Sequence, residues 1–240
     1  TSAGSDLSSF DALQGGETLT LSGSGTSASA NVANGIAMSS NGNLALVDGT
    51  GLASNYSLNS TVINITERVL NSSGSKIYDA NTDALAADIT LSNLVSGEAL
   101  NHSGTATISS ANAGSYTITN LAGITIADGS GGTASNYTLT GGTHNFTVNP
   151  KVVSIQGNKT YDGNTTISSG DITSITDTVG AETLVISSGS GTVSSANAAT
   201  YASAGINEGT LTLGNGTNGG LASNYTLTGH AASSFQVTQR

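Results

Sequence analysis

The chain of 240 residues contains no cysteine, no tryptophan, a single proline and few charged side chains, which make up only 8% of the sequence. Without cysteine, no disulfide stabilises the fold and no thiol is available as a nucleophile. Five basic residues stand against fifteen acidic ones, so the net charge is −10. Such a chain cannot neutralise a nucleic-acid backbone and is repelled by anionic lipid. We therefore expect no nucleic-acid partner and no direct insertion into a membrane.

Long apolar segments are also missing. No run approaches the roughly 18–20 residues of a membrane-spanning helix. The first residues, Thr1–Gly4, have neither the basic stretch nor the apolar core of a signal peptide. Hydrophobic residues nevertheless make up 36% of the chain and alternate with polar ones. That alternation favours a folded protein over the disorder that abundant Ser, Thr, Asn and Gly would otherwise suggest.

What the sequence does contain is a long repeat. The pattern Ser-Asn-Tyr-polar-Leu occurs three times, with starting positions separated by 81 and 88 residues. The three copies are Ser54–Leu58, Ser135–Leu139 and Ser223–Leu227. This period exceeds the roughly 20–50 residues of solenoid repeats and matches the size of a small domain. A tandem array therefore explains the chain better than one globular enzyme.

Further landmarks recur in the same order. The segment Lys76–Asn81 (Lys-Ile-Tyr-Asp-Ala-Asn) is matched by Lys159–Asn164 (Lys-Thr-Tyr-Asp-Gly-Asn), and each copy ends in an alternating strand. A glutamate and an Ala-Asn pair also recur, at Glu17, Glu98 and Glu182 and at Ala30-Asn31, Ala111-Asn112 and Ala196-Asn197. These landmarks divide the chain into a first repeat (residues 1–66), a second repeat (67–150) and a third repeat (151–240), which we expect to be separate modules.

The alignment of the repeats leaves no residues for a Lys-x-Tyr-Asp segment in the first repeat, because Thr82 of the second repeat falls on Thr1. We expect an open sheet edge there, or a strand borrowed from elsewhere. We also expect the chain to be a segment of a longer array.

The fold class follows from the local pattern. Apolar and polar residues alternate, as in Thr18–Leu21 and Tyr137–Leu139, which is typical of strands with one buried face. Turn dipeptides such as Asn34-Gly35 and Asp128-Gly129 separate these segments, and helical periodicity is nearly absent. We predict an all-β fold of three tandem small β-sandwich-like modules arranged end to end. β-grasp-like modules are the alternative.

These motifs closely resemble YDG-type repeats, which are related to the so-called MBG domains. The resemblance rests on the Lys-x-Tyr-Asp-Gly/Ala-Asn segments, the recurring glutamates, the Ser-Asn-Tyr-x-Leu strands and the closing strand before Pro150. Ala80 departs from it by replacing the glycine of the name-giving motif. The resemblance implies a stalk or adhesive repeat of a large secreted bacterial adhesin, similar to filamentous haemagglutinins exported by two-partner secretion. It also implies an extracellular or cell-surface location and no catalytic residues.

The repeats single out a set of structural-motif residues: Lys76, Tyr78, Asp79, Glu98, Tyr137, Lys159, Tyr161, Asp162, Glu182 and Tyr225. One hypothesis pairs each glutamate with the lysine of the first strand as an ion pair. A bolder one joins Lys and Asn in an intramolecular isopeptide bond assisted by Glu, which requires a desolvated lysine beside a protonated carboxyl. The tyrosines of the Ser-Asn-Tyr segments are interpreted as core aromatics whose hydroxyls bond the backbone.

Metal and modification sites have weaker support. We expect no cofactor. Calcium is an alternative at single aspartates such as Asp48 and Asp128, although isolated aspartates beside glycine are typical of turns. The histidines lack the spacing of a zinc site or a catalytic triad, and we expect them at the surface. The asparagines Asn55, Asn136 and Asn224 lie in Asn-x-Ser/Thr sequons, where a glycan could be attached.

The sequence therefore predicts a monomeric, non-catalytic array whose partners are neighbouring repeats of the same polypeptide. The array would project a distal binding region and add weak multivalent contacts. A module that binds host or matrix glycans is the alternative. Few aromatic residues, 4% of the chain, speak against that alternative because sugar sites commonly expose aromatic rings. No nucleophile–base pair or metal constellation indicates an enzyme.

Overall fold

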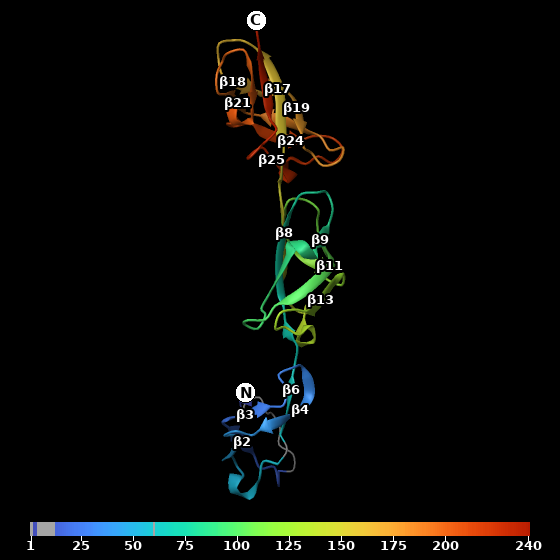
Figure 1. Cartoon of the computed structure of the whole chain (residues 1–240), viewed down its shortest axis with the longest axis vertical. Helices are drawn as coiled ribbons and strands as arrows, with labels where there is room; N and C mark the ends of the chain where they lie inside the picture. The colour runs from blue at the N-terminus through green and yellow to red at the C-terminus, as the bar shows by residue number, and fades with distance from the viewer. Residues whose placement is uncertain (1, 4–12, 60) are drawn as a thin grey trace. The chain divides into compact units, whose positions relative to one another are not determined.

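A computed structural model describes residues 2–3, 13–59 and 61–240. Every element in the described part is a β-strand or a single 3-10 turn, so the all-β prediction is confirmed (Figure 1). None of the described residues belongs to a helix that is long and apolar enough to cross a membrane.

The elements follow the three repeats in order. The first repeat contains β1 (Ser2–Ala3), β2 (Leu19–Ser22), β3 (Ser24–Ser27), β4 (Ala33–Ser40), β5 (Ala45–Asp48), η2 (Ala53–Asn55) and β6 (Val62–Ile65). The second contains β7 (Arg68–Val69), β8 (Asn71–Ile77), β9 (Asp83–Leu85), η3 (Ala86–Asp88), β10 (Ile89–Ser92), β11 (Leu100–Ile108), β12 (Gly114–Asn120), β13 (Ile124–Asp128), η4 (Ala134–Asn136), β14 (Tyr137–Thr138) and β15 (His144–Asn149). The third contains β16 (Lys151–Val152), β17 (Ser154–Thr160), β18 (Thr166–Ser168), η5 (Ser169–Asp171), β19 (Ile172–Thr176), β20 (Leu184–Ser188), β21 (Ser190–Val193), β22 (Ala199–Ala202), η6 (Ser203–Gly205), β23 (Ile206–Asn207), β24 (Thr212–Asn215), η7 (Ala222–Asn224), β25 (Tyr225–Thr226) and β26 (Ser234–Thr238).

Spatial proximity groups the chain into two compact units. The first unit comprises Thr1–Asn71, Asn93–Asn101 and Ile126–Gly142, and the second comprises Ser72–Ser92, His102–Thr125 and Thr143–Arg240. The line between the units passes through the second repeat. The division into three modules at residues 66 and 150 stays a prediction.

The first unit contains a four-stranded sheet in the order β1-β3-β4-β6 and the two-stranded pairs β2-β5 and β14-β7. Strand β6 pairs with β4 on one side, and it is the last strand of its sheet among the described residues. Within the described residues, β6 is therefore the edge strand of this sheet, and the open edge of the whole first repeat stays a prediction.

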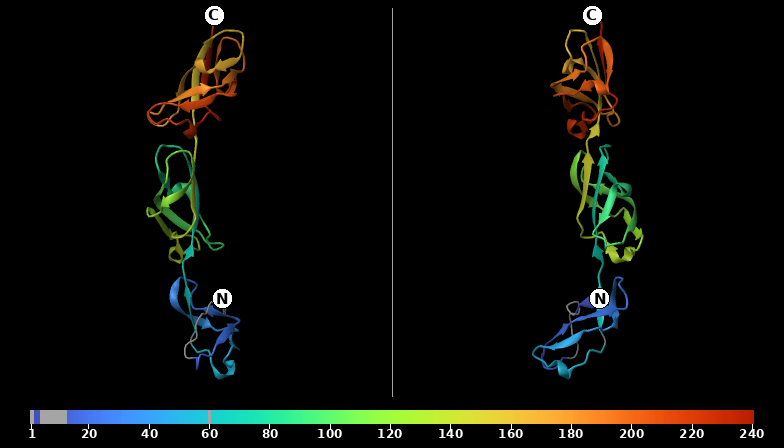
Figure 2. Two further views of the ribbon diagram at one scale, coloured as in Figure 1. Left: turned by 180° about the vertical axis from the view of Figure 1, so that it is seen from behind. Right: turned by 60° about the vertical axis from the view of Figure 1, so that its left-hand side comes forward.

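The second unit holds most of a sheet with the order β10-β8-β15-β12-β11-β13 and, in the third repeat, a sheet with the order β19-β17-β26-β22. In both sheets the first long strand of the repeat runs parallel to its last strand, β8 with β15 and β17 with β26. The right-hand view of Figure 2 shows β8 and β15 next to each other. Parallel strands cannot be joined by a tight turn, so the intervening strands of the repeat form the connection between them.

The core is built on the last strand of each repeat. Phe146 in β15 and Phe235 in β26 are 1% and 0% exposed, and buried residues alternate with exposed ones along both strands. Each phenylalanine lies opposite a glycine of the parallel strand, Gly74 or Gly157. A Cβ atom at Gly157 would come within 2.4 Å of the Asp171 carbonyl oxygen and 2.8 Å of the Phe235 ring. Glycine is therefore required where the ring crosses the neighbouring backbone.

Candidate functional site

The Lys-x-Tyr-Asp-x-Asn segment forms a closed turn just after β8 and again after β17. In the second repeat, the Lys76 Nζ donates to Asp79 Oδ1 at 2.8 Å, to Asn81 Oδ1 at 2.7 Å and to the Asn81 carbonyl at 2.9 Å. The asparagine side chain donates back to Asp79 Oδ2 at 2.9 Å. Lysine, aspartate and asparagine thus saturate one another, which explains why the three residue types recur together.

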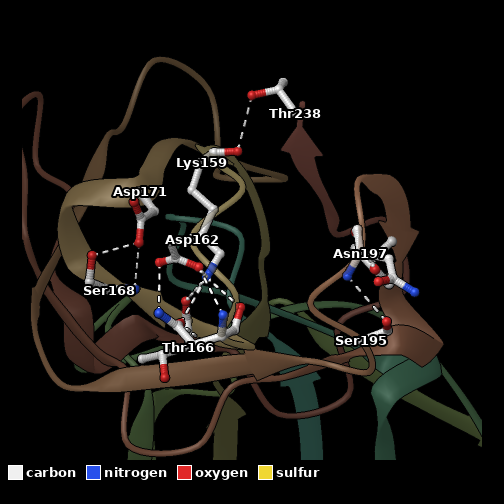
Figure 3. A network of polar contacts seen from close by, with 10 residues as sticks. Lys159, Asp162, Thr166, Ser168, Asp171, Ser195, Asn197 and Thr238 are labelled. Atoms are coloured by element: carbon white, nitrogen blue, oxygen red, sulfur yellow. Dashed lines mark hydrogen bonds and ion pairs between the residues drawn. The ribbon is translucent and has the colours of Figure 1, made fainter. Parts of the chain in front are cut away.

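The turn of the third repeat repeats this arrangement with one more bond (Figure 3). Its amine, Lys159 Nζ, donates to Asp162 Oδ1 at 3.0 Å and to Asn164 Oδ1 at 3.0 Å. It also donates to the carbonyl oxygens of Asn164 and Thr166 at 2.8 and 2.9 Å. The Lys159 side chain is only 6% exposed. A buried ammonium with four oxygen partners is satisfied and stabilises the turn.

The aspartates of both turns are held as carboxylates. Partial burial opposes ionisation of Asp79, but hydrogen bonds from Lys76 and Asn81 outweigh it and lower the pKa of Asp79. In the third repeat, the backbone N–H of Asn164 and then the Lys159 ammonium lower the pKa of Asp162. Each of these aspartates therefore stays ionised in neutral solution.

The residue after the aspartate adopts a left-handed backbone conformation. The φ angle is +64° at Ala80 and +82° at Gly163. Glycine reaches this region without strain, whereas a side chain costs about 1–2 kcal/mol. The glycine of the motif is thus explained by the turn, and Ala80 occupies the same position under strain.

The recurring glutamates do not pair with these lysines, so the predicted Lys–Glu ion pair is wrong. Each glutamate instead accepts a hydrogen bond from the tyrosine of the Ser-Asn-Tyr segment in its own repeat. The pairs are Tyr56–Glu17 at 2.5 Å, Tyr137–Glu98 at 2.5 Å and Tyr225–Glu182 at 2.6 Å. With the glutamate engaged elsewhere, the described residues do not assemble the Lys–Asn–Glu set that an isopeptide bond requires.

Each of these tyrosines has a second partner in the backbone. The hydroxyl accepts a hydrogen bond from the N–H of Gln14, Val95 or Val179, which lies three residues before the glutamate. The prediction of backbone-bonded core tyrosines is therefore confirmed for Tyr137 and Tyr225, which are 4% and 5% exposed, and Tyr56 is half-buried. Burial and the bond to Glu98 raise the pKa of Tyr137, and burial and the bond to Glu182 raise the pKa of Tyr225.

In the second unit, Glu182 of the third repeat also contacts the second repeat. Its other oxygen accepts a hydrogen bond from the Tyr78 hydroxyl at 2.7 Å, across 104 residues of sequence. The rings of Tyr78 and Tyr225 meet edge to face with centroids 5.3 Å apart. Burial and this carboxylate raise the pKa of Tyr78 to about 12. The tyrosine of the turn therefore belongs to a contact between repeats.

The asparagine of the Ser-Asn-Tyr segment completes this contact. Asn224 has no exposed surface, and its Oδ1 accepts a hydrogen bond from the Ala113 N–H at 2.8 Å. Its Nδ2 donates to Asn112 Oδ1 at 3.0 Å. Asn112 belongs to the Ala-Asn landmark of the second repeat, so two recurring motifs of unassigned purpose are the two halves of one contact.

The same asparagine pair occurs in the first unit. Asn136 Oδ1 accepts a hydrogen bond from the Val32 N–H at 2.8 Å, and Asn136 Nδ2 donates to Asn31 Oδ1 at 2.9 Å. The Ser-Asn-Tyr segment of one repeat thus binds the Ala-Asn segment of the repeat before it, twice in the chain.

Local structure places this asparagine at the start of its repeat. The tyrosine strands β14 and β25 pair in parallel with β7 and β16, the first strands of the second and third repeats. The asparagine is the last residue of a 3-10 turn. The first N–H of that turn donates to Asp128 Oδ1 at 2.7 Å in the second repeat and to Asn215 Oδ1 at 2.8 Å in the third. The segment is therefore fixed where the preceding repeat ends.

A family model described as the YDG domain matches residues 65–145 and 143–233, which together are more than half of the chain. The chain belongs to the YDG domain family. No curated protein and no solved structure matches it. In the YDG repeats of this chain, lysine, aspartate and asparagine of the name-giving motif close a turn, and its tyrosine at position 78 reaches the next repeat.

Other candidate residues of the YDG repeats have structural partners. Asp48 Oδ1 and Asp128 Oδ1 each accept a backbone N–H at 2.7 Å, which confirms them as turn residues. No group of three His, Asp or Glu side chains that could hold a metal ion occurs in the part of the chain that the structure describes. Of the three Ser-Asn-Tyr sequons, Asn224 is buried with its amide donating a hydrogen bond, whereas Asn55 is exposed.

The expectation of surface histidines is wrong. His144 is 6% exposed and bonded to the Ser72 hydroxyl at 2.9 Å, and the His230 side chain is 5% exposed beside Glu208 at 3.1 Å. The ring of His102 lies 3.0 Å from two carbonyl oxygens, those of Ala86 and Ile89. In each imidazole the apolar part of the ring can be covered while one ring nitrogen bonds a nearby group.

Proposed function

We propose that this chain is a non-catalytic stalk segment of a secreted or surface-exposed bacterial adhesin. Its YDG repeats would hold a distal binding region away from the cell and add weak multivalent contacts. The location outside the cell and the adhesin context come from the resemblance of the motifs to such proteins.

One observation carries the stalk part of the proposal. The contact between the second and third repeats buries Asn224 and brings Tyr78 and Tyr225 onto one carboxylate. A repeat whose recurring polar residues bind the adjacent repeat is suited to building an array. Hydrogen bonds to a charged group are worth about 1.5–3 kcal/mol each, so this contact resists bending between the second and third repeats.

Scattering in solution tests the stalk. A single globule of 240 residues has a radius of gyration of about 18 Å. Three repeats of about 12 Å each, spaced about 35 Å apart in a row, give a radius near 30 Å. Small-angle X-ray scattering on the whole chain should yield the larger value, and a radius near 18 Å would contradict a stalk. Labelling of intact cells of the source organism with antibody to the chain tests its location independently.

A glycan-binding module remains the second candidate. A hollow of about 560 Å³ in the third repeat is lined by leucines and by residues with amide, carboxylate or hydroxyl groups, among them Asn207, Glu208, Thr212 and Thr226. Such groups suit sugar hydroxyls. A glycan array probed with the chain distinguishes the two functions, because a sugar-binding module gives saturable signals that Glu208→Ala abolishes, whereas a stalk gives none.

A further inference from the structure

The contact between the second and third repeats has a side that faces forward along the chain. It consists of Tyr78, Asn112 and Ala113 of the second repeat, which receive Glu182, Asn224 and Tyr225 of the third. We name the first three residues, and their equivalents in other repeats, the forward face. The second three residues and their equivalents form the rear face.

The forward face of the third repeat has the same residues but a different exposure. Tyr161 is 42% exposed, whereas its equivalent Tyr78 is 5% exposed. Ala198 is exposed, whereas Ala113 is half-buried. Exposed tyrosine rings at the surface of a protein mark interaction sites more often than isolated aliphatic residues do. The forward face of the third repeat is thus uncovered in the 240-residue chain.

This uncovered face is already in the shape of the covered one. Its turn is closed by the four hydrogen bonds of Lys159. Its bend is fixed because the Asn197 N–H bonds the Ser195 hydroxyl at 3.2 Å, as seen in Figure 3, and the Asn112 N–H bonds Ser110 at the same distance. A preformed surface loses little conformational entropy on binding, which favours association.

The chemistry of the face defines its occupant. Tyr161 needs an acceptor for its hydroxyl and an aromatic edge, as Tyr78 finds in Glu182 and Tyr225. The bend at Asn197 needs a side-chain amide whose oxygen accepts a backbone N–H and whose nitrogen donates to the asparagine oxygen. Asn224 provides both, because it accepts from the Ala113 N–H and donates to Asn112 Oδ1. The first repeat carries this set uncovered, with Asn55 exposed and Tyr56 bonded to Glu17.

We infer that Tyr161, Asn197 and Ala198 form a docking surface for the rear face of another YDG repeat joined to the third repeat. The incoming repeat places its glutamate on the Tyr161 hydroxyl and its Ser-Asn-Tyr asparagine on Asn197 and Ala198. This inference uses the array part of the proposed function and does not depend on the adhesin role.

The register of the strands defines how a fourth repeat must be attached for a test. Thr238 pairs with Thr160 as Asn149 pairs with Ile77, so Thr238 is the equivalent of the residue before Pro150. A second copy of residues 150–240 is therefore joined directly after Thr238. Tyrosine nitration followed by peptide mass spectrometry then compares Tyr161 in the 240-residue chain and in the extended chain.

The extended chain should protect Tyr161 from nitration by about tenfold or more, a factor that corresponds to about 1.4 kcal/mol of docking. The last copy of Tyr161 should stay reactive and serve as the internal reference. A matched extended chain with Asn224→Ala and Glu182→Gln in the added copy should restore reactivity at Tyr161. Equal reactivity of Tyr161 in the 240-residue and extended chains would overturn the inference.

The scattering experiment tests the stalk, and the nitration experiment tests the docking surface, so the two proposals can be contradicted separately. A compact particle with a protected Tyr161 would contradict the stalk and retain the docking surface. An extended particle with a reactive Tyr161 would contradict the docking surface and retain the stalk.

Discussion

The two Lys-x-Tyr-Asp turns, at Tyr78 and at Tyr161, share their internal hydrogen bonds and differ in what surrounds the tyrosine. In both, a buried lysine bonds an aspartate and an asparagine. Only Tyr78 is covered, by Glu182 and Tyr225. The difference teaches that the motif has two separable parts. Lysine, aspartate and asparagine close the turn within a repeat, and tyrosine binds the repeat that follows.

The largest effect is expected from emptying the covered site. Asn224→Ala leaves the Ala113 N–H and the Asn112 side chain without their partner, at a cost of about 2 kcal/mol. Asn55→Ala changes the same motif where it is exposed and should cost less than about 0.5 kcal/mol. Calorimetric melting and hydrogen exchange of the Ala113 amide measure both variants. Equal effects of the two substitutions would contradict the assigned role of this asparagine.

Removing the tyrosine hydroxyls compares the two turns directly. Tyr78→Phe loses a hydrogen bond to a carboxylate and should destabilise the chain by about 1.5 kcal/mol. Tyr161→Phe should change stability by less than about 0.5 kcal/mol because Tyr161 is 42% exposed. Chemical denaturation gives these values, and a double-mutant cycle of Tyr78→Phe with Glu182→Gln isolates the pair. The absence of any coupling in the cycle would refute the contact.

Alkaline pH should ionise the covered Tyr78 and weaken its contact with the third repeat. Folding raises the pKa of Tyr78 from 10.0 to about 12, first through burial and then through Glu182. The neutral phenol therefore stabilises the contact below pH 10, and this stabilisation is lost as the pH rises from about 10 to about 12. Denaturation measured across this window should show a steeper fall for the unmodified chain than for Tyr78→Phe. Identical pH profiles would argue that Tyr78 ionises without affecting the fold.

The smallest effect is expected in the left-handed residue of each turn. Ala80→Gly removes the strain of a φ of +64° and should stabilise the second repeat by about 0.5–1 kcal/mol. Gly163→Ala should destabilise the third repeat by about 1 kcal/mol. A Cβ atom there meets nothing within 4 Å, so the cost is confined to the backbone. Melting temperatures of the two variants should shift in opposite directions.

Much of the fold could be predicted from the sequence, because alternation of apolar and polar residues is a local signal. It correctly predicted strands at Tyr137–Thr138 and at the closing segments, and turns at Asp48 and Asp128. The parallel pairing of the first and last strands of a repeat could not be predicted, since its partners lie more than 70 residues apart. Alternation within one strand carries no information about the direction of its neighbour.

The candidate site was predicted as a set of residues but not as a set of contacts. The motif tyrosine, the glutamate and the asparagines meet across 104 to 112 residues, so no local pattern indicates their partners. Opposite charge suggested a Lys–Glu pair, but each lysine is satisfied within seven residues by its own turn. One usable signal existed: glutamate and tyrosine are separated by 39 residues in both the first and second repeats.

Every repeat of this chain carries an Ala-Asn bend and, further along the sequence, an Asn-Tyr segment. Of these residues, only the tyrosine contributes a large side chain to the interior of its repeat. In-frame duplication or loss of one whole unit in the gene would therefore rejoin matching surfaces at the new boundary. The protein could lengthen or shorten by recombination without any compensating substitution, as a chain of identical couplings does when a link is added.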